Sequence, residues 1–188
     1  ICFHDSDIGG VLIKDLNYSD IIKINAQIPT LEQILWSTKG KISIEVELKE
    51  SGYEADVIAM VLDYFNYDEF VIKSFNYLTI KKVKEIDGKI YAGLLLGSDY
   101  TVEQLEAVLR ESFTLGKFTL SQADFISAHY KIFTAGFLFK FVRQNIPIQV
   151  WTVNNADSIR NLINLELYSV VTDIPETALE IRKNLSDV

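Results

Sequence analysis

The sequence predicts an α/β fold, a (β/α)8 barrel of the TIM type, and two observations indicate this class. Short apolar runs alternate with longer helical patterns along the chain, which is typical of successive βα units and a parallel sheet. Polar residues directly follow several of the apolar runs, at Lys49, Ser74, Asn154 and Asp173. In a barrel the loops after the strands converge on one face, which carries the active site. An open doubly wound sheet is the alternative architecture, and the clustering of polar residues after the strands favours the barrel.

Each expected strand is a short run rich in Ile, Val, Leu or Phe, as strands buried on both faces tend to be. The runs are Lys41–Lys49, Phe70–Ser74, Ile90–Leu95, Ala123–His129, Ile148–Val153 and Ser169–Thr172. Helical patterns are found at Leu31–Ser37, Ala55–Tyr64, Leu78–Glu85, Val102–Ser112, Thr134–Gln144 and Asp157–Leu165. Pro175 then precedes a last helix, Glu176–Asn184.

The start of the chain predicts that the barrel is N-terminally incomplete. Ile1-Cys2-Phe3-His4 is an apolar run without a Met or a helix cap, which is typical of the middle of a strand. A closed barrel has eight strands in ~250 residues, so we expect the first two strands, roughly 60 residues by that arithmetic, to lie outside this sequence. Residues 1–188 are interpreted as a single barrel domain that lacks its first two strands.

Composition excludes several classes of protein. Hydrophobic residues make up 48% and charged residues 23% of the 188 residues, which is ordinary for a globular domain. No apolar run approaches the ~20 residues of a membrane-spanning helix, and no signal peptide is visible, so we expect a cytoplasmic protein without a transmembrane segment. The formal net charge is -8 and no basic patch is present, which argues against nucleic acid as a partner. The only cysteine is Cys2, so no intramolecular disulfide can form.

The run Ile42–Lys49 carries the most informative charges. Strand side chains alternate between two faces, so Glu45, Glu47 and Lys49 share one face. In a strand covered on both sides these charges lie in the barrel interior, where they must be paired or bind a metal. Carboxylate oxygens suit Mg²⁺ and Ca²⁺, and Lys49 could hold a phosphate as a point charge. A solvated edge strand with alternating charges is the alternative.

Three further residues each have a chemical and a structural interpretation. His4 follows the first apolar run and could act as a general acid or base, or it could be a surface residue. Trp151 ends an expected strand and could form an apolar wall for a ligand, or it could be a core residue ahead of a helix cap. His129 lies within an apolar strand and could be a ligand, but it is interpreted as a hydrogen-bonded core histidine. The sequence contains no nucleotide-binding glycine motif, no nucleophile elbow and no Cys/His zinc spacing.

Taken in order, the segments of this chain resemble the glycerophosphodiester phosphodiesterase family. The family pattern runs through HD after a short strand, then I-P-T-L-E, I-E-hydrophobic-K, S-F, W-T-hydrophobic-N and T-D-x-P. The corresponding segments here are His4-Asp5, Ile28–Glu32, Val46–Lys49, Ser74-Phe75, Trp151–Asn154 and Thr172–Pro175. The resemblance covers essentially the whole chain.

The resemblance implies a metal-dependent phosphoric diester hydrolase that converts a glycerophosphodiester into glycerol 3-phosphate and an alcohol, a reaction of lipid and glycerol metabolism. His4 resembles the second of two catalytic histidines, which protonates the departing alcohol. Glu47 resembles a ligand of the divalent cation, Mg²⁺ or Ca²⁺. Lys49 resembles the lysine that holds the phosphate. Phe75 and Trp151 resemble apolar residues of the substrate pocket.

The chain also departs from the family pattern. Glu45 stands where the family has a small polar residue, and we expect it to form an ion pair with Lys73 or Lys49. The first catalytic histidine, in a His-Arg-Gly motif, and two further metal ligands, in a Glu-x-Asp motif, are expected upstream of Ile1. We therefore expect the 188-residue stretch by itself to be inactive and to form homo-oligomers through exposed strand edges. A catalytically silent barrel that binds a phosphate-bearing ligand or a partner protein is the alternative function.

Overall fold

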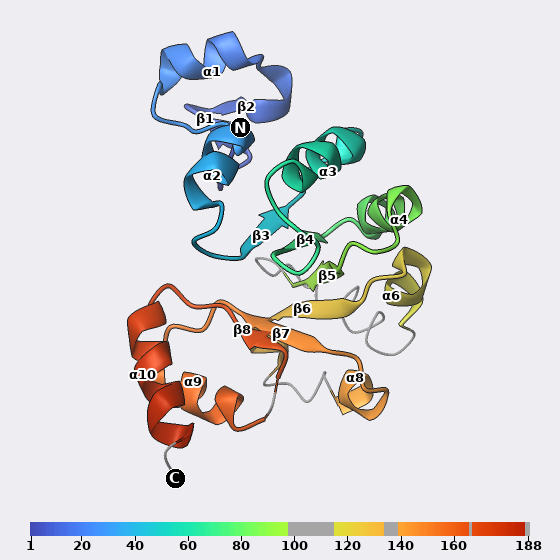
Figure 1. Cartoon of the computed structure of the whole chain (residues 1–188), viewed down its shortest axis with the longest axis vertical. Helices are drawn as coiled ribbons and strands as arrows, with labels where there is room; N and C mark the ends of the chain where they lie inside the picture. The colour runs from blue at the N-terminus through green and yellow to red at the C-terminus, as the bar shows by residue number, and fades with distance from the viewer. Residues whose placement is uncertain (98–114, 134–138, 166, 187–188) are drawn as a thin grey trace. The chain divides into compact units, whose positions relative to one another are not determined.

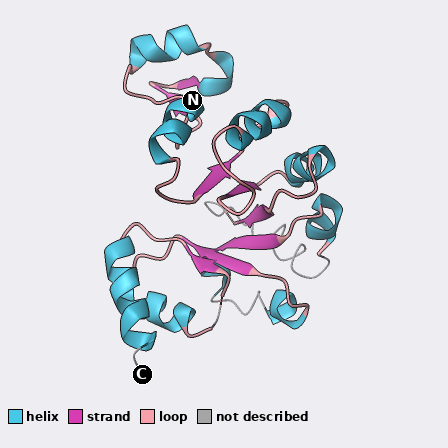
Figure 2. Cartoon of the chain, viewed as in Figure 1, coloured by secondary structure: helices cyan, strands magenta, loops and turns pink. Residues whose placement is uncertain are grey.

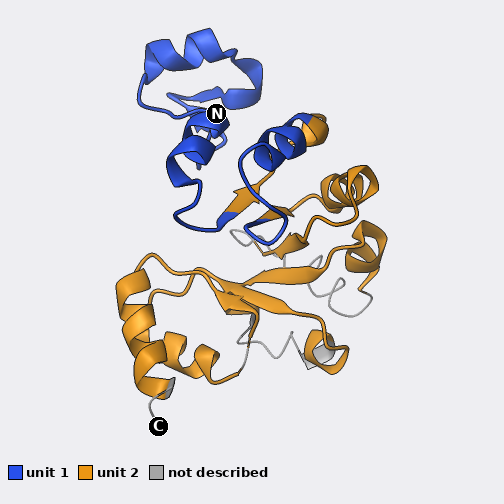
Figure 3. Cartoon of the chain, viewed as in Figure 1, with its two compact units in different colours: residues 1–44, 56–70 blue, residues 45–55, 71–188 orange. Residues whose placement is uncertain are grey.

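The computed structural model describes residues 1–97, 115–133, 139–165 and 167–186. They form two compact units, each made of two stretches of the chain (Figure 3). Unit 1 consists of residues 1–44 and 56–70, and unit 2 consists of residues 45–55 and 71–188. Within the described ranges, no helix combines the length and the apolar character that crossing a membrane requires.

Unit 1 contains a small antiparallel hairpin made of β1 (Asp7–Ile8) and β2 (Val11–Leu12). Gly9 and Gly10 form its two-residue turn, with φ angles of 62° and 84°. Glycine adopts positive φ without steric cost, and turns of this kind match the twist of two paired strands. A short 3-10 helix, η1 (Ile13–Asp15), follows the hairpin.

Two helices of unit 1 begin at capping residues. The helix α1 (Tyr18–Ile24) starts after Asn17, whose side chain accepts a hydrogen bond from the Asp20 amide. The helix α2 (Leu31–Thr38) starts after Thr30, which forms a complete capping box with Gln33. Caps of this kind give partners to amide groups that the first turn of a helix leaves unpaired.

The prediction of a strand at Ile1–His4 is wrong. This segment has no strand pairing, and the Cys2 amide donates to the Pro29 carbonyl at 2.9 Å. Phe3 packs against a small buried cluster that contains Ile8, Ile21 and Ile28. The apolar run therefore contributes to a local core and not to a sheet, and apolar content alone does not distinguish the two cases.

Unit 2 is built on a six-stranded sheet in the order β3-β4-β5-β6-β7-β8 (Figures 1 and 2). The strands are β3 (Ile44–Glu47), β4 (Phe70–Ser74), β5 (Ala92–Leu96), β6 (Phe125–His129), β7 (Ile148–Trp151) and β8 (Ser169–Val170), the first residues of β3 and β4 being counted with unit 1. The pairs from β4 to β8 are parallel. Spatial order and chain order coincide, so the described sheet lacks the switch point of a doubly wound fold. The prediction of a barrel-type sheet is confirmed.

A helix follows each strand whose connection is described. These helices are α3 (Glu54–Leu62), α4 (Tyr77–Ile86), α7 (Tyr130–Phe133), α8 (Phe139–Arg143), α9 (Ala156–Ile163) and α10 (Pro175–Ser186), while α6 (Gly116–Ser121) precedes β6. The helix predicted at Val102–Ser112 lies outside the described residues. Of the helix predicted at Thr134–Gln144, the described part contains α8.

Aromatic rings fill the interior of unit 2 where β6 begins. Phe125 is fully buried, and its ring centroid lies 5.2 Å from that of Tyr91 and 5.0 Å from that of Tyr168. Gly93 on β5 is the register partner of Phe125, and a Cβ atom at Gly93 would overlap the Phe125 ring. Glycine at this position therefore makes room for the ring.

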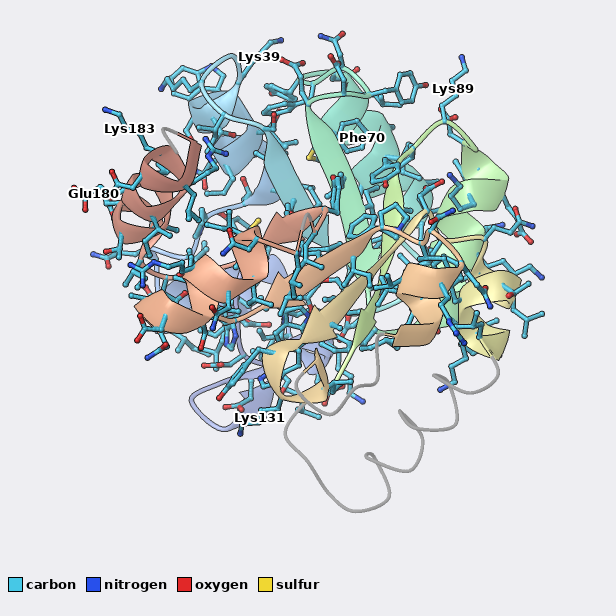
Figure 4. All side chains as sticks on the ribbon, turned by 90° about the horizontal axis from the view of Figure 1, so that it is seen from below. Lys39, Phe70, Lys89, Lys131, Glu180 and Lys183 are labelled. Atoms are coloured by element: carbon cyan, nitrogen blue, oxygen red, sulfur yellow. The ribbon has the colours of Figure 1, made fainter. Side chains whose placement is uncertain are left out.

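Charged side chains of unit 2 lie largely at its periphery. Figure 4 shows Lys89, Lys131, Glu180 and Lys183 projecting from the outer surface. Lys73 on β4 differs, because only 8% of this residue is exposed. A buried ammonium group must be compensated by an opposite charge and hydrogen bonds. We therefore expect Lys73 to have charged or polar partners inside unit 2.

Candidate active site at the carboxyl ends of the strands

Glu47 and Lys49 form an ion pair where β3 ends. The Lys49 Nζ atom lies 3.2 Å from the Glu47 Oε1 atom, and the two side chains are 42% and 34% exposed. Because both charged groups remain accessible, each can also meet a ligand of opposite charge. The ammonium group suits a phosphate, and the carboxylate suits a hard cation.

Glu45 precedes this pair on the same face of β3 and has different partners. Its carboxylate forms an ion pair with Lys73 of β4 and accepts a hydrogen bond from Gln149 of β7. The expected ion pair between Glu45 and Lys73 is therefore present. Burial, and secondarily the charge of Glu45, raise the pKa of Tyr168. Tyr168 lies just before β8.

Gln149 connects the strands of the sheet through its fully buried side chain. Its Oε1 atom accepts hydrogen bonds from Lys73 at 2.9 Å and from Ser127 at 2.7 Å. Its Nε2 atom donates to Glu45 at 2.6 Å and to Ser169 at 2.7 Å. The four bonds use the full hydrogen-bonding capacity of the amide, so its orientation is fixed. We call these five residues the interior polar network.

An aromatic cluster lies at the ends of the neighbouring strands. The Trp151 ring meets Phe75 edge-on at a centroid distance of 5.7 Å and His129 at 4.9 Å. The Trp151 Nε1–H group donates to the Ser127 carbonyl at 3.0 Å, and Phe75 is 46% exposed. Edge-to-face pairs and an indole hydrogen bond fix ring orientation. This cluster, defined as Phe75, His129 and Trp151, is a rigid and partly accessible apolar wall.

His129 is the last residue of β6 and is partly exposed, not fully buried. Its Nδ1 atom accepts a hydrogen bond from the Lys131 amide at 3.3 Å. The prediction of a hydrogen-bonded histidine thus fits the geometry, whereas a core position does not. The reason is that β6 ends at His129, where the strand leaves the covered part of the sheet.

His4 belongs to unit 1, where its side chain is 95% exposed. Its Nδ1 atom lies 2.8 Å from an oxygen of Asp5. A neighbouring carboxylate of this kind can orient an imidazole through a hydrogen bond.

The described side chains provide few oxygen donors for a divalent cation. Across the described ranges, no group of three or more His, Cys, Asp or Glu side chains gathers in a way that could hold a metal ion. Glu47 offers one carboxylate at the end of β3, and Mg²⁺ and Ca²⁺ normally take several oxygen ligands. The described side chains by themselves therefore do not form a complete cation site.

Residues 1–177 match the glycerophosphoryl diester phosphodiesterase family. The chain belongs to this family. Membership of the glycerophosphoryl diester phosphodiesterase family places the chain among the phosphoric diester hydrolases, so the predictions of family and enzyme class are confirmed.

Individual relatives of this family member are distant in sequence but similar in fold. A glycerophosphodiester phosphodiesterase of Caldanaerobacter subterraneus subsp. tengcongensis is 21% identical over 203 residues, covering 96% of this chain and 79% of that protein. The crystal structure of a glycerophosphodiester phosphodiesterase from Parabacteroides distasonis has a TM-score of 0.75 at 22% identity, covering 98% of this chain and 78% of that chain. A phosphodiesterase from Oleispira antarctica, solved in complex with the product sn-glycerol-3-phosphate, has a TM-score of 0.68 at 18% identity, covering 95% and 77%.

Several segments of the family pattern have structural roles in this chain. Thr30 caps α2. The Ser74 hydroxyl donates to the Leu48 carbonyl at 2.7 Å, which holds the end of β4 to the end of β3. Asn154 bonds the side chain of Asp173 at 2.7 Å and the Asp173 amide at 2.9 Å, which ties together the loops after β7 and β8. The contacts of Ser74 and Asn154 hold together the loops that follow strands of unit 2.

The interior polar network was not predicted as a unit. A signal was nevertheless present, because Lys73 and Gln149 each interrupt an otherwise apolar run. A charged or amide side chain within a strand buried on both faces needs a partner on the same layer. Pairing such interruptions across the expected strands would have located the network.

Proposed function

We propose that this protein hydrolyses glycerophosphodiesters to glycerol 3-phosphate and an alcohol, with substrates such as glycerophosphocholine or glycerophosphoethanolamine. The observation that carries the proposal is the accessible Glu47–Lys49 pair at the end of a barrel strand in a member of this family. The Oleispira antarctica neighbour was solved with sn-glycerol-3-phosphate as its product, which supports the same product here. The reaction would supply glycerol 3-phosphate from deacylated lipids.

The residues of unit 2 take three roles in this proposal. Lys49 holds the phosphate through its ammonium group. Phe75 and Trp151 form the apolar wall of the substrate pocket and exclude water on one side of the bound diester. Glu47 is the carboxylate that this chain contributes to a divalent cation, Mg²⁺ or Ca²⁺. The cation would supply Lewis-acid stabilisation of the phosphate charge.

His4 is proposed as the acid that protonates the departing alcohol oxygen. Support comes from the family pattern and from the His4–Asp5 hydrogen bond. A general acid typically contributes ~10²–10⁴-fold to a rate. The His4→Asn variant should therefore lose turnover of glycerophosphocholine while retaining much of its activity on a diester with a nitrophenol leaving group, which needs no protonation.

The test uses the protein as its whole gene encodes it. Release of glycerol 3-phosphate from glycerophosphocholine is followed with a coupled dehydrogenase, with added Mg²⁺, with added Ca²⁺ and after chelation. Turnover that chelation abolishes and one of the two cations restores is the expected result. Binding of glycerophosphocholine without turnover under every cation would contradict the proposal and would favour a silent barrel that binds a phosphate-bearing ligand.

The cytoplasmic location and the absence of nucleic acid as a partner stay predictions. Cell fractionation tests the first, and a DNA and RNA binding assay at low salt tests the second. We expect no binding of nucleic acid, because the protein has a net charge of -8 and nucleic acid is also negatively charged.

A further inference from the structure

His129 lies in the same layer of unit 2 as residues of the candidate site, and the proposed reaction gives it no role. In a barrel sheet, a residue and the one two positions later on the strand point to the same side. The interior polar network defines one layer through its hydrogen bonds. Two residues further along four of its strands stand Glu47, Phe75, His129 and Trp151. His129 therefore belongs to the next layer toward the carboxyl ends of the strands.

Contacts between rings support this placement of His129. It is the register partner of Trp151 at the ends of β6 and β7, and the two ring centroids are 4.9 Å apart. Trp151 in turn meets Phe75 at a centroid distance of 5.7 Å. The three rings thus form a continuous series, and a ligand that lies on the Trp151 ring has the imidazole as its neighbour.

The surroundings of His129 define which ring nitrogen is a donor. Its Nδ1 atom accepts a hydrogen bond from the Lys131 amide at 3.3 Å, so the neutral imidazole carries its proton on Nε2. The rings of Tyr130 and Trp151 both lie against the imidazole at centroid distances of 4.9 Å, which restricts its rotation. His129 is therefore a hydrogen-bond donor of defined orientation next to an apolar wall.

We propose that His129 is a specificity-determining residue, which donates a hydrogen bond from Nε2 to a hydroxyl group of the glycerol part of the substrate. The inference rests on the proposed function, because it takes Phe75 and Trp151 as the wall of the substrate pocket. Glycerol hydroxyl oxygens accept hydrogen bonds, whereas a choline head group is positively charged and has no hydroxyl group. A fixed donor therefore suits the glycerol side of the phosphate, where the wall covers carbon atoms and His129 recognises a hydroxyl group.

The experiment compares two ligands that differ only in these hydroxyl groups, sn-glycerol 3-phosphate and n-propyl phosphate. Both carry the same phosphate and the same charge, so their affinity ratio isolates recognition of the hydroxyl groups. Calorimetry gives both dissociation constants for the protein that the whole gene encodes, in the presence of Mg²⁺. The wild type should bind glycerol 3-phosphate more tightly by about 3- to 10-fold, the effect of a single hydrogen bond.

Two variants separate hydrogen bonding from packing. His129→Phe keeps a ring against Trp151 but has no donor, so the preference for glycerol 3-phosphate should disappear. His129→Gln loses the ring but brings an amide N–H group close to the position of Nε2, so it should keep part of the preference. A purely structural role would give the opposite order, because packing against Trp151 favours Phe over Gln. Circular dichroism checks folding, and if one variant does not fold, the other decides alone.

Lys131→Met is the matched control. It removes a charge two residues from His129 but keeps the backbone amide that bonds Nδ1, and the Lys131 side chain projects from the outer surface (Figure 4). Its preference for glycerol 3-phosphate should equal that of the wild type.

Four results would overturn the role of His129. They are equal affinity of the wild type for both ligands, a wild-type preference in folded His129→Phe, a His129→Gln variant that loses as much preference as His129→Phe, and equal weakening of both ligands in His129→Phe. The last result would place the imidazole at the phosphate. Absence of glycerophosphocholine turnover, with a preference that His129→Phe removes and His129→Gln partly keeps, would overturn the proposed function and leave the role of His129 standing.

Discussion

At the scale of single residues, two glutamates on the same face of β3 have different partners. Glu45 is bonded to the buried side chains of Lys73 and Gln149, although its own side chain is 40% exposed. Glu47, two residues later, has Lys49 as its partner and is also accessible. Strand alternation predicted the shared face of these residues, and Lys73 was one of the two expected partners of Glu45. The contact with Gln149 was not predicted, because Gln149 lies on a strand far away in the sequence.

The Lys49→Met variant should lose binding of the phosphate, and Glu47→Gln should weaken binding of the cation, so both should lose most of their turnover. Removing a charged group that stabilises a phosphate in the transition state costs on the order of 10²–10³-fold in turnover. Lys89→Met and Glu180→Gln are the controls, because these side chains project from the outer surface (Figure 4). Steady-state kinetics on glycerophosphocholine measures the effect. Equal kcat/KM in the site variants and their controls would show that the residues are misassigned.

The raised pKa of Tyr168 predicts that the folded protein loses stability in alkaline solution. Its pKa is raised in the folded protein above the ordinary value of 10.0, first by burial and then by Glu45. The folded state therefore keeps a proton that the unfolded chain releases, so this stability is present below pH 10 and is lost as pH rises through the folded pKa. Tyr168→Phe should reduce the decline of the urea midpoint above about pH 10. An unchanged decline would exclude Tyr168 as a cause.

At the scale of elements, strands and helices of unit 2 were predictable because they alternate with the periods of a βα repeat. The strand at Phe70–Ser74 was predicted with the observed bounds. The elements of the first 24 residues were not predicted. β1 and β2 have two residues each, too few to show alternation, and their turn is the Gly9-Gly10 pair. The residues before α2 therefore show no hydrophobic periodicity from which their helices and strands could be predicted.

Gly93→Ala should destabilise unit 2 by forcing a methyl group against the Phe125 ring. Overpacking of a filled core costs roughly 1–3 kcal/mol. Gly88→Ala is the matched control, because a Cβ atom there meets only the Lys84 carbonyl at an ordinary 3.7 Å, and its effect should stay within about 0.5 kcal/mol. Urea unfolding of both variants measures the difference. Equal stabilities would show that the ring can move aside.

At the scale of the whole molecule, the sequential order β3 to β8 leaves a strand at each end of the described sheet. Terminal strands present unpaired amide and carbonyl groups that pair with other chains. The 188-residue chain expressed by itself should therefore self-associate, and light scattering coupled to gel filtration should give a mass above 21.4 kDa. A monomeric mass at all concentrations would indicate that both terminal strands are covered.

The sequence predicted the family and fold of the molecule, because six short segments in a fixed order carry both. It could not assign all the chemical roles. Several residues of the pattern, such as Thr30 and Ser74, form hydrogen bonds with the backbone. The interior polar network is instead built on Lys73 and Gln149, which the pattern does not contain. Tertiary pairing between strands decides those contacts, and a single sequence does not contain that information.

The central claim is most directly tested by phosphorus NMR of glycerophosphocholine incubated with the protein that the whole gene encodes, in the presence of Mg²⁺ or Ca²⁺. The account predicts that the phosphodiester signal is replaced by the signal of a phosphomonoester, and that the conversion is lost in Lys49→Met and retained in Lys89→Met. A phosphodiester signal that persists with the wild type under both cations, or a conversion that Lys49→Met leaves at the wild-type rate, would contradict it.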